Sequence, residues 1–355
     1  MRILLLGEFS SFYNYLADGL KVLGHDVFLA NNGDGARGFY ADYNWAKGTS
    51  GKLGKLQGIF NIYNHRELFK GFDVVQLISP TYSPSLPWVN RKFVEYLIAH
   101  NDRLFWTPAG TSQLIDRFWI EESPVKHPLY EYFKANSKGR KMFYEHPSII
   151  EYEKWFIENM NGIIAPCFDY AEPFRKLDNF CGTIPFPINV DKIQYKPNRV
   201  KDKIVFYHGV TRPGKGTSFI REAFDRMRPT YNEIAKFSCV QHLPFDEYMK
   251  LVANTNIVLD QTRSYGSGMN GLISLAQGKI VLGGAEPEHI HELGYSSCPI
   301  INITSDTNQI CEAIQYVIDN KEHIEEMGAK SRLFIEEYHH YVKVAKEYVI
   351  KWGVD

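Results

Sequence analysis

The chain has 355 residues, which is too long for one compact core and about right for two domains. Its composition, 44% hydrophobic and 23% charged, excludes a disordered protein, and its net charge of -1 excludes binding to nucleic acid by overall charge. The five cysteines are scattered and form no CxxC pair, which excludes a disulfide framework and a zinc site. The apolar run at residues 3–6 is too short for a signal peptide, so we expect a cytoplasmic protein.

The first part of the chain alternates strand-like and helix-like segments. Residues 2–6 form a continuous apolar run typical of a strand buried in a parallel sheet, and apolar residues then recur at helical spacing from Phe12 to Leu23. Gly24 ends this helix, and residues 25–31 supply a second strand. Three more strands are predicted at residues 73–79, 103–108 and 162–166. This alternation predicts a doubly wound α/β domain.

A proline-rich stretch without helical period, residues 180–202, predicts the boundary between two domains. Five strand-like segments follow it, each before a helix-like segment: residues 203–208, 236–241, 256–261, 279–284 and 299–303. We therefore expect a Rossmann-like domain over residues 1–190, a second one over residues 191–335, and a final helix, residues 336–355, that packs back on the first domain.

Residues 113–158 form a less regular segment in which aromatic residues interleave with charges, including Lys134, Lys138, Arg140 and Lys141. Such a basic aromatic surface is typical of weak peripheral contact with anionic lipids, here at the cytoplasmic face of the inner membrane. The alternative is a solvated insertion whose aromatic residues pack on the first domain.

The segment HGVTRPGKGT, residues 208–217, is a glycine-rich turn between a strand and an amphipathic helix. It matches the P-loop pattern GxxxxGK at Gly209, Gly214 and Lys215. In a P-loop the next residue is Ser or Thr, whose hydroxyl binds Mg²⁺, but here it is Gly216. The sequence therefore disfavours a P-loop kinase.

Lys215 and Arg212 nevertheless lie on a glycine turn at a helix N-terminus. Two cations beside free backbone N–H groups favour the binding of a diphosphate. The alternative for this loop alone is a surface turn with two solvated cations.

A second glycine-rich loop follows a buried strand that ends in Asp260 and leads into a helix over residues 269–277. Gly266, Gly268 and Gly271 permit a close approach of the backbone to a phosphate. Because both loops follow parallel strands of one domain, we expect them to face the same crevice. This coincidence favours a nucleotide site.

Five segments, in order along nearly the whole chain, resemble motifs of the retaining GT-B glycosyltransferases of family four, which includes many bacterial transferases of polysaccharide and lipopolysaccharide synthesis. They are LGEFSSFYNYLADGLKVLGHDV, WTPAGTS, GIIAPCFDYAEPFRKL, HGVTRPGKGT and SYGSGMNGLISLAQGKIVLGG. The resemblance implies a GT-B fold, with two Rossmann-like domains facing each other across a cleft. It also implies transfer of a hexosyl or other glycosyl group from a nucleoside-diphosphate sugar, of UDP or GDP type, to a carbohydrate or lipid-linked acceptor. Retention of configuration is implied, without a metal or other cofactor.

The resemblance also implies which residues form the site. Lys215 and Arg212 would be catalytic, stabilising diphosphate charge as the bond between sugar C1 and oxygen breaks. The implied donor and phosphate residues are His208, Gly209, Tyr265, Gly266, Ser267, Gly268, Met269, Asn270 and Gly271; the nucleoside residues are Gln241, His242 and Leu243; and the acceptor side comprises Gly7, Thr111 and Ser112. We expect Lys215→Ala to abolish transfer and to leave the fold intact.

The chain departs from the family pattern at four positions. The family's arginine falls on Val210, its two E-x7-E glutamates fall on Tyr265 and Ile273, and its acceptor-domain histidine falls on Ala109. Because Tyr and Ile supply no carboxylate, donor recognition differs from that of the family or catalysis is weakened. Three alternatives therefore stay open: a weak or inactive nucleotide-sugar-binding scaffold, a nucleotide-sugar epimerase and a P-loop kinase.

Overall fold

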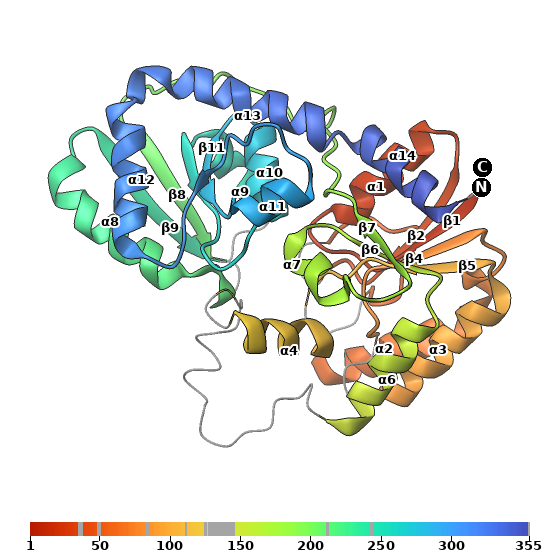
Figure 1. Cartoon of the computed structure of the whole chain (residues 1–355). Coiled ribbons are helices and arrows are strands. Elements are labelled where there is room, and N and C mark those ends of the chain that lie inside the picture. The colour runs from red at the N-terminus through yellow and green to blue at the C-terminus, as the bar shows by residue number, and fades with distance from the viewer. Residues whose placement is uncertain are drawn as a thin grey trace. The chain divides into compact units, whose positions relative to one another are not determined.

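The computed structural model describes the chain except residues 35–37, 48–50, 83–85, 111, 124–125, 127–145, 211–212, 242–244 and 354–355. The chain forms two compact units, each with its own parallel sheet (Figure 1). The first unit comprises Met1–Phe118, Arg140–Pro187 and Tyr341–Asp355, and the second comprises Trp119–Gly139 and Ile188–His340.

The first unit contains a seven-stranded sheet in the order β3-β2-β1-β4-β5-β6-β7. Its strands are β1 (Arg2–Leu6), β2 (Asp26–Asn31), β3 (Tyr43–Asn44), β4 (Val74–Leu77), β5 (Arg103–Trp106), β6 (Gly162–Ala165) and β7 (Phe180–Thr183). Its α-helices are α1 (Phe12–Val22), α2 (Gly51–Asn64), α3 (Pro87–His100), α6 (Pro147–Glu158), α7 (Phe168–Ala171) and α14 (Tyr341–Trp352), and its short 3₁₀ helices are η2 (Arg66–Phe69) and η5 (Glu172–Phe174). The boundary with the second unit falls within a further helix, α4 (Gln113–Glu122).

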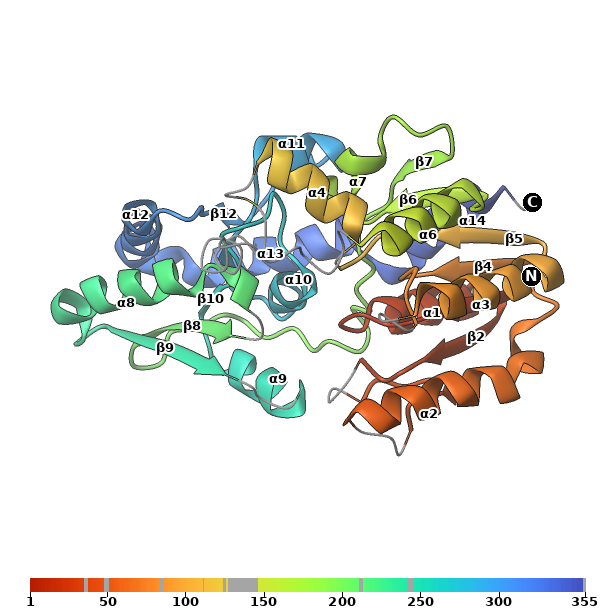
Figure 2. The same ribbon diagram turned by 90° about the horizontal axis from the view of Figure 1, so that it is seen from below.

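The helices of the first unit cover both faces of its sheet. The chain moves from β1 to β2 in one direction and from β4 to β5 in the other, so right-handed crossovers place α1 and α3 on opposite faces. Helices α3 and α6 lie side by side (Figure 2). Central strand β1 is consequently buried on both sides, and Ile3 to Leu6 have no exposed surface.

Helix α14 returns from the end of the chain to pack along α1. A Cβ atom on Gly19 would lie 2.4 Å from the Tyr341 carbonyl oxygen, so glycine permits this close approach. Buried hydrogen bonds fasten α14 to the sheet: Trp352 Nε1 donates to Gln76 Oε1 at 2.7 Å, and Gln76 Nε2 donates to Thr107 Oγ1 at 3.0 Å. The last helix is therefore part of the first unit.

The second unit contains a five-stranded sheet in the order β12-β11-β10-β8-β9. Its strands are β8 (Ile204–Val210), β9 (Ala235–Gln241), β10 (Ile257–Leu259), β11 (Ile280–Gly283) and β12 (Ile301–Asn302). Its helices are α8 (Thr217–Tyr231), α9 (Phe245–Ala253), α10 (Met269–Ala276), α11 (Pro287–Glu292), α12 (Thr307–Asp319), α13 (Ile324–Tyr338) and the 3₁₀ helices η6 (Pro213–Lys215) and η7 (Lys321–His323).

The core of the second unit lies between its sheet and the paired helices α8 and α12. Phe206 and Ile257 from the sheet are fully buried against Ile220 and Phe224 of α8 and Ile314 of α12. Figure 2 shows α8 alongside β8 and β9. Helices α10 and α13 pack together, and the opposite crossover from β10 to β11 places α10 on the other face.

The predicted fold class is confirmed, because both units are doubly wound parallel α/β sheets. All ten strands predicted from the sequence are present, but β3 and β7 are additional. Strand β7 lies within the stretch assigned to the linker; it is a half-buried edge strand in which Gly182 has a φ of +103°, so it lacks the apolar run of the inner strands. The four basic residues Lys134, Lys138, Arg140 and Lys141 lie outside the described residues. Among the helices that the structure describes, none is long and apolar enough to cross a membrane.

Candidate functional site

The loops after β8 and β10 meet at the switch point of the second sheet. These two strands are neighbours, although the chain visits β9 between them and β9 lies on the far side of β8. In open α/β sheets, ligands bind where the strand order reverses in this way. Thr262 N in the second loop donates to the Lys215 carbonyl oxygen in the first at 3.2 Å, so the loops are in direct contact.

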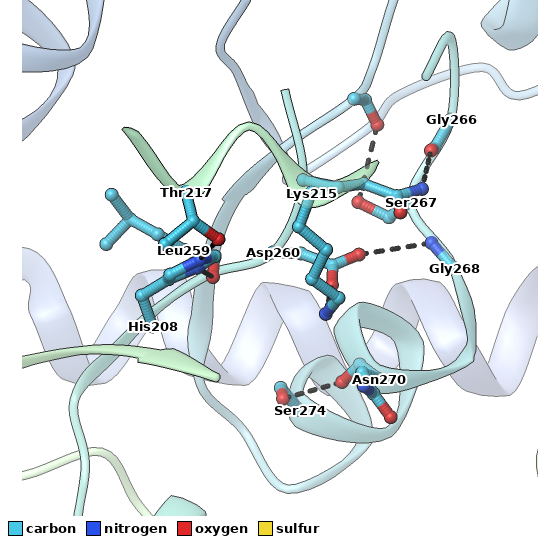
Figure 3. A network of polar contacts seen from close by, with 12 residues as sticks. His208, Lys215, Thr217, Leu259, Asp260, Gly266, Ser267, Gly268, Asn270 and Ser274 are labelled. Atoms are coloured by element: carbon cyan, nitrogen blue, oxygen red, sulfur yellow. Dashed lines mark hydrogen bonds and ion pairs between the residues drawn. The ribbon is translucent and has the colours of Figure 1, made fainter. Parts of the chain in front are cut away.

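Lys215 and Asp260 point toward each other at this switch point (Figure 3). Lys215 Nζ lies 2.9 Å from Asp260 Oδ1, and the two side chains are only 6% and 2% exposed. The other carboxylate oxygen, Oδ2, accepts a hydrogen bond from Gly268 N at 3.2 Å. One carboxylate therefore binds both the predicted phosphate lysine and the glycine loop before α10.

His208 lies at the same site and forms hydrogen bonds with two neighbouring elements (Figure 3). Its Nδ1 lies 2.8 Å from the Leu259 carbonyl oxygen, which only accepts hydrogen bonds, so Nδ1 carries the proton. Its Nε2, 2.9 Å from Thr217 Oγ1, then accepts from that hydroxyl. Burial lowers the pKa of His208 to about 4, which keeps the ring neutral. His208 thus links β8, β10 and the start of α8.

Gly216 explains the failure of the P-loop pattern. Its φ is +71°, and a Cβ atom there would lie 1.9 Å from Thr262 Oγ1. Neither Ser nor Thr fits at this position, and the hydroxyl of Thr217 already donates to His208. The structure therefore gives no support to a P-loop kinase.

Helix α10 begins directly over the Asp260 carboxylate. A Cβ atom on Gly271 would lie 3.1 Å from Asp260 Oδ2, and Ser267 and Met269 are nearly buried. Asn270, another predicted phosphate residue, is half-buried, and its backbone carbonyl oxygen accepts a hydrogen bond from Ser274 Oγ at 2.7 Å. The first N–H groups of a helix have no partner within the helix and carry partial positive charge, which suits a phosphate group.

Tyr265 and Gly266 lie beside a cluster formed by Trp119, Lys126 and Glu286. The Tyr265 ring lies 5.3 Å from that of Trp119, and Lys126 Nζ lies 5.2 Å from the Tyr265 ring centre. Lys126 also forms an ion pair with Glu286, whose backbone N–H donates to the Tyr265 carbonyl oxygen at 2.9 Å. A carboxylate is therefore present next to the position at which the family has its first glutamate.

The family's second glutamate position has no such replacement within α10. Ile273 is 1% exposed and belongs to the core. Gly266 has no room for a side chain, because a Cβ atom there would lie 2.3 Å from His289 Cε1. Burial lowers the pKa of His289 to about 4, so its ring is a neutral packing element.

The predicted nucleoside segment begins at the same edge of the sheet. Gln241 ends β9, where its Cα pairs with that of Val210 at the end of β8. Gly209 precedes Val210, and a Cβ atom on it would lie 2.9 Å from the hydroxyl of Tyr207. The remaining predicted residues Thr111, Arg212, His242 and Leu243 lie outside the described residues.

On the acceptor side, Gly7 lies at the switch point of the first sheet, between β1 and β4. Its φ is +100°, and a Cβ atom would lie 2.4 Å from Ile78 Cγ2. The next residue, Glu8, is buried and accepts hydrogen bonds from Asn14 N at 2.9 Å and from Tyr13 N at 3.4 Å. Burial raises the pKa of Glu8 to about 7, although these hydrogen bonds oppose the shift.

Ser112, the other described acceptor-side residue, caps α4. Its Oγ accepts from Ile115 N at 3.2 Å, and Glu153 of α6 accepts from Gln113 N at 2.8 Å. Burial raises the pKa of Glu153. Phe9 reaches from the first glycine loop to Gly110, where a Cβ atom would lie 3.2 Å from its Cζ. The loops that carry Gly7 and Ser112 therefore meet at one edge of the first sheet.

Two buried carboxylates, Asp260 and Glu8, were absent from the site predicted from the sequence. Both directly follow the apolar run of a strand or its terminal glycine, which is the available sequence signal. That signal predicts that each carboxylate lies at the end of a buried strand, but it does not predict which group the carboxylate binds. Among the described residues, no group of three or more His, Cys, Asp and Glu side chains is arranged to hold a metal ion.

The amino-acid sequence matches no family model and no curated protein. Solved structures, in contrast, resemble the chain over nearly its full length. HepE of Anabaena, in complex with UDP and glucose, shares 12% identity at a TM-score of 0.62, with 99% of each chain covered. Sucrose-phosphate synthase of Thermosynechococcus elongatus shares 10% identity at a TM-score of 0.64, covering 99% of this chain and 98% of that one.

The fold is GT-B. An α-glucosyltransferase solved with UDP and a 13-mer DNA is similar in fold, with 10% identity, a TM-score of 0.62 and coverage of 100% of this chain and 99% of that one. At such identities the similarity is one of fold. The reaction of a GT-B protein depends on the residues of its site and not on the fold alone.

Proposed function

We propose that the protein is a glycosyltransferase that moves a hexosyl or related group from a nucleoside-diphosphate sugar to an acceptor. One observation carries the proposal: Lys215 and the first turn of α10 converge at the switch point of the second sheet. A cation and a helix N-terminus are suited to a diphosphate leaving group. HepE, which shares the fold, has been solved with UDP-glucose, so UDP is the preferred nucleotide and GDP the alternative.

The proposed chemistry requires stabilisation of negative charge on the diphosphate as the bond to sugar C1 breaks. Lys215 and Arg212 supply cations, and the backbone N–H groups from Gly266 to Gly271 supply hydrogen bonds. The nucleoside binds near Gln241. The reaction proceeds with retention and without a metal, as the resemblance to family four implies.

The acceptor binds to the first unit, near Gly7, Thr111 and Ser112. A carbohydrate or a lipid-linked glycan of bacterial polysaccharide synthesis is the proposed class. A lipid-linked acceptor would fit a cytoplasmic protein with weak contact at the membrane through residues 113–158.

Donor hydrolysis tests this function without knowledge of the acceptor, because glycosyltransferases transfer slowly to water. Purified protein is incubated with UDP- and GDP-sugars, with and without EDTA, and nucleotide release is measured. We expect release from one donor class, unchanged by EDTA, with the freed sugar initially in the donor's anomeric configuration by NMR. No release from any donor, together with no thermal shift by UDP, GDP, ADP or CMP, would contradict the proposal.

A non-catalytic nucleotide-sugar-binding protein is the second candidate. It is favoured by Tyr265 and Ile273 at the glutamate positions and by the Asp260 carboxylate that already neutralises Lys215. Donor binding measured by calorimetry, without hydrolysis and without transfer to a broad acceptor panel, would favour this candidate.

A further inference from the structure

We propose that Asp260 is an internal counter-anion that weakens the binding of diphosphate at the switch point of the second unit. The inference rests on the proposed function, because it concerns the same donor site. The Asp260 carboxylate binds Lys215 Nζ at 2.9 Å and Gly268 N at 3.2 Å. A lysine cation and a loop N–H are the kinds of group that bind a diphosphate. The protein thus uses its own carboxylate on groups suited to the donor.

The charge balance of the site supports this role. Within the cluster of Lys215, Asp260 and His208, the lysine and the aspartate cancel each other, and His208 is neutral because its Nδ1 donates to Leu259 and its Nε2 accepts from Thr217. Arg212, the other proposed cation of the site, adds one positive charge to this neutral cluster. A nucleoside diphosphate carries at least two negative charges. With the Asp260 carboxylate beside it, the diphosphate meets repulsion as well as the attraction of Lys215.

Burial makes this repulsion effective. The Asp260 side chain is 2% exposed and that of Lys215 is 6% exposed, so solvent screens them less than surface charges. An ammonium group has three N–H donors, and Asp260 Oδ1 accepts one of them. Lys215 therefore remains able to bind phosphate while Asp260 sets the strength of the interaction.

The functional consequence concerns product release. The diphosphate gains charge when the sugar leaves, so the nucleoside diphosphate product is repelled by Asp260 more strongly than the donor is. Product release limits the turnover of many enzymes. A counter-anion at this position therefore favours exchange of product for donor.

A positioning role for Asp260 predicts the opposite effect on affinity. If the carboxylate served to aim Lys215 at the phosphate, its removal would weaken diphosphate binding. If it is a counter-anion, its removal strengthens binding. The sign of the change distinguishes the two roles.

The test compares the dissociation constants of UDP and uridine for the full-length wild type, Asp260→Asn and Asp260→Ser. Asparagine keeps an oxygen at the position that accepts from Gly268 but has no charge. Serine removes the charge with a shorter side chain, so the two variants test the same point independently, and circular dichroism shows whether each one folds. Asp225→Asn is the matched control, because it removes one carboxylate that is 61% exposed on α8 in the same unit. Uridine controls for changes outside the phosphate site.

We expect the dissociation constant of UDP to fall about tenfold in the Asp260 variants, which corresponds to about 1.4 kcal/mol, with that of uridine unchanged. UDP binding by the variants but not by the wild type also supports the proposal. Equal or weaker UDP binding in the folded variants, with a wild type that binds UDP, overturns it and leaves the proposed function standing. No UDP binding by any protein, while circular dichroism shows all to be folded, overturns this proposal and counts against UDP as the donor nucleotide of the proposed function.

Discussion

The ammonium group of Lys215 and the carboxylate of Asp260 form a buried ion pair, 2.9 Å long, that joins the loop after β8 to the loop after β10. Forty-five positions separate the two residues in the chain. A buried charge that loses its partner is costly, because neither water nor another group compensates it. The pair is consequently a structural element of the second unit as well as part of its proposed donor site.

Lys215→Ala is therefore expected to lower the free energy of unfolding by about 3–5 kcal/mol, because it leaves the Asp260 carboxylate buried and unpaired. This differs from the expectation drawn from the sequence, that the variant keeps an intact fold. Urea denaturation measures the change. Lys215→Met combined with Asp260→Asn removes both charges and is expected to recover most of the loss. Exposed Lys201→Ala serves as the control, and equal stability of Lys215→Ala and Lys201→Ala would contradict the prediction.

Gly216→Ser restores the P-loop pattern in the sequence but is expected to destabilise the protein. The residue has a φ of +71°, and the new Cβ atom would meet Thr262 Oγ1 at 1.9 Å. We expect a loss of about 1–3 kcal/mol, measured by thermal or urea unfolding, and no Mg²⁺-dependent phosphoryl transfer. Gly216→Ser combined with Thr262→Ala relieves the contact but not the backbone strain, so partial recovery is expected. A fully stable single variant would show that the loop has another conformation.

His208 is expected to make the protein sensitive to acid. Burial lowers its pKa to about 4, whereas the unfolded chain titrates near 6.5. Between these values the unfolded state binds a proton that the folded state does not, so stability falls as pH falls from about 6.5 to about 4. The expected contribution is about 3 kcal/mol over this range. Unfolding in urea at pH 7.5, 5.5 and 4.5 measures it.

His208→Gln is the informative variant for this test. Its amide N–H can replace Nδ1–H as donor to Leu259, its oxygen can accept from Thr217, and it does not titrate. We expect a shallower loss of stability in acid than in the wild type, with His289 supplying the remaining dependence. The exposed His65→Gln should retain the wild-type dependence. An unchanged acid profile in His208→Gln would refute the assignment.

Glu8 has the opposite pH dependence. Burial raises its pKa from 4.5 to about 7, so the folded state binds the proton more tightly than the unfolded state. Its contribution to stability is full below pH 4.5 and is lost as pH rises through about 7, a change of about 3 kcal/mol. Glu8→Gln should therefore gain stability relative to the wild type between pH 5 and pH 8. Exposed Glu151→Gln, also in the first unit, should show no such relative gain.

The sequence by itself determined ten of the twelve strands that the structure describes, the fold class and the positions of the two glycine-rich loops after β8 and β10. These features depend on local patterns: continuous apolar runs mark buried parallel strands, and glycines mark turns that need a positive φ or close packing. Lys215 was placed correctly at the start of a helix after β8 for the same reason. Edge strand β7 was not predicted from the sequence, because it lacks an apolar run.

Only the tertiary structure decided which charges meet. Asp260 is recognisable in the sequence as the residue after a buried strand, but its pairing with Lys215 depends on β8 and β10 being neighbours. The hydroxyl of Thr217, two residues after Lys215, likewise has a partner that only the fold reveals, because it donates to His208 of β8. Ser112 becomes a helix cap, and Glu8 becomes a buried acid at the start of α1. The energy of a buried polar group depends on its partners across the fold, and the spacing of residues along the chain does not contain that information.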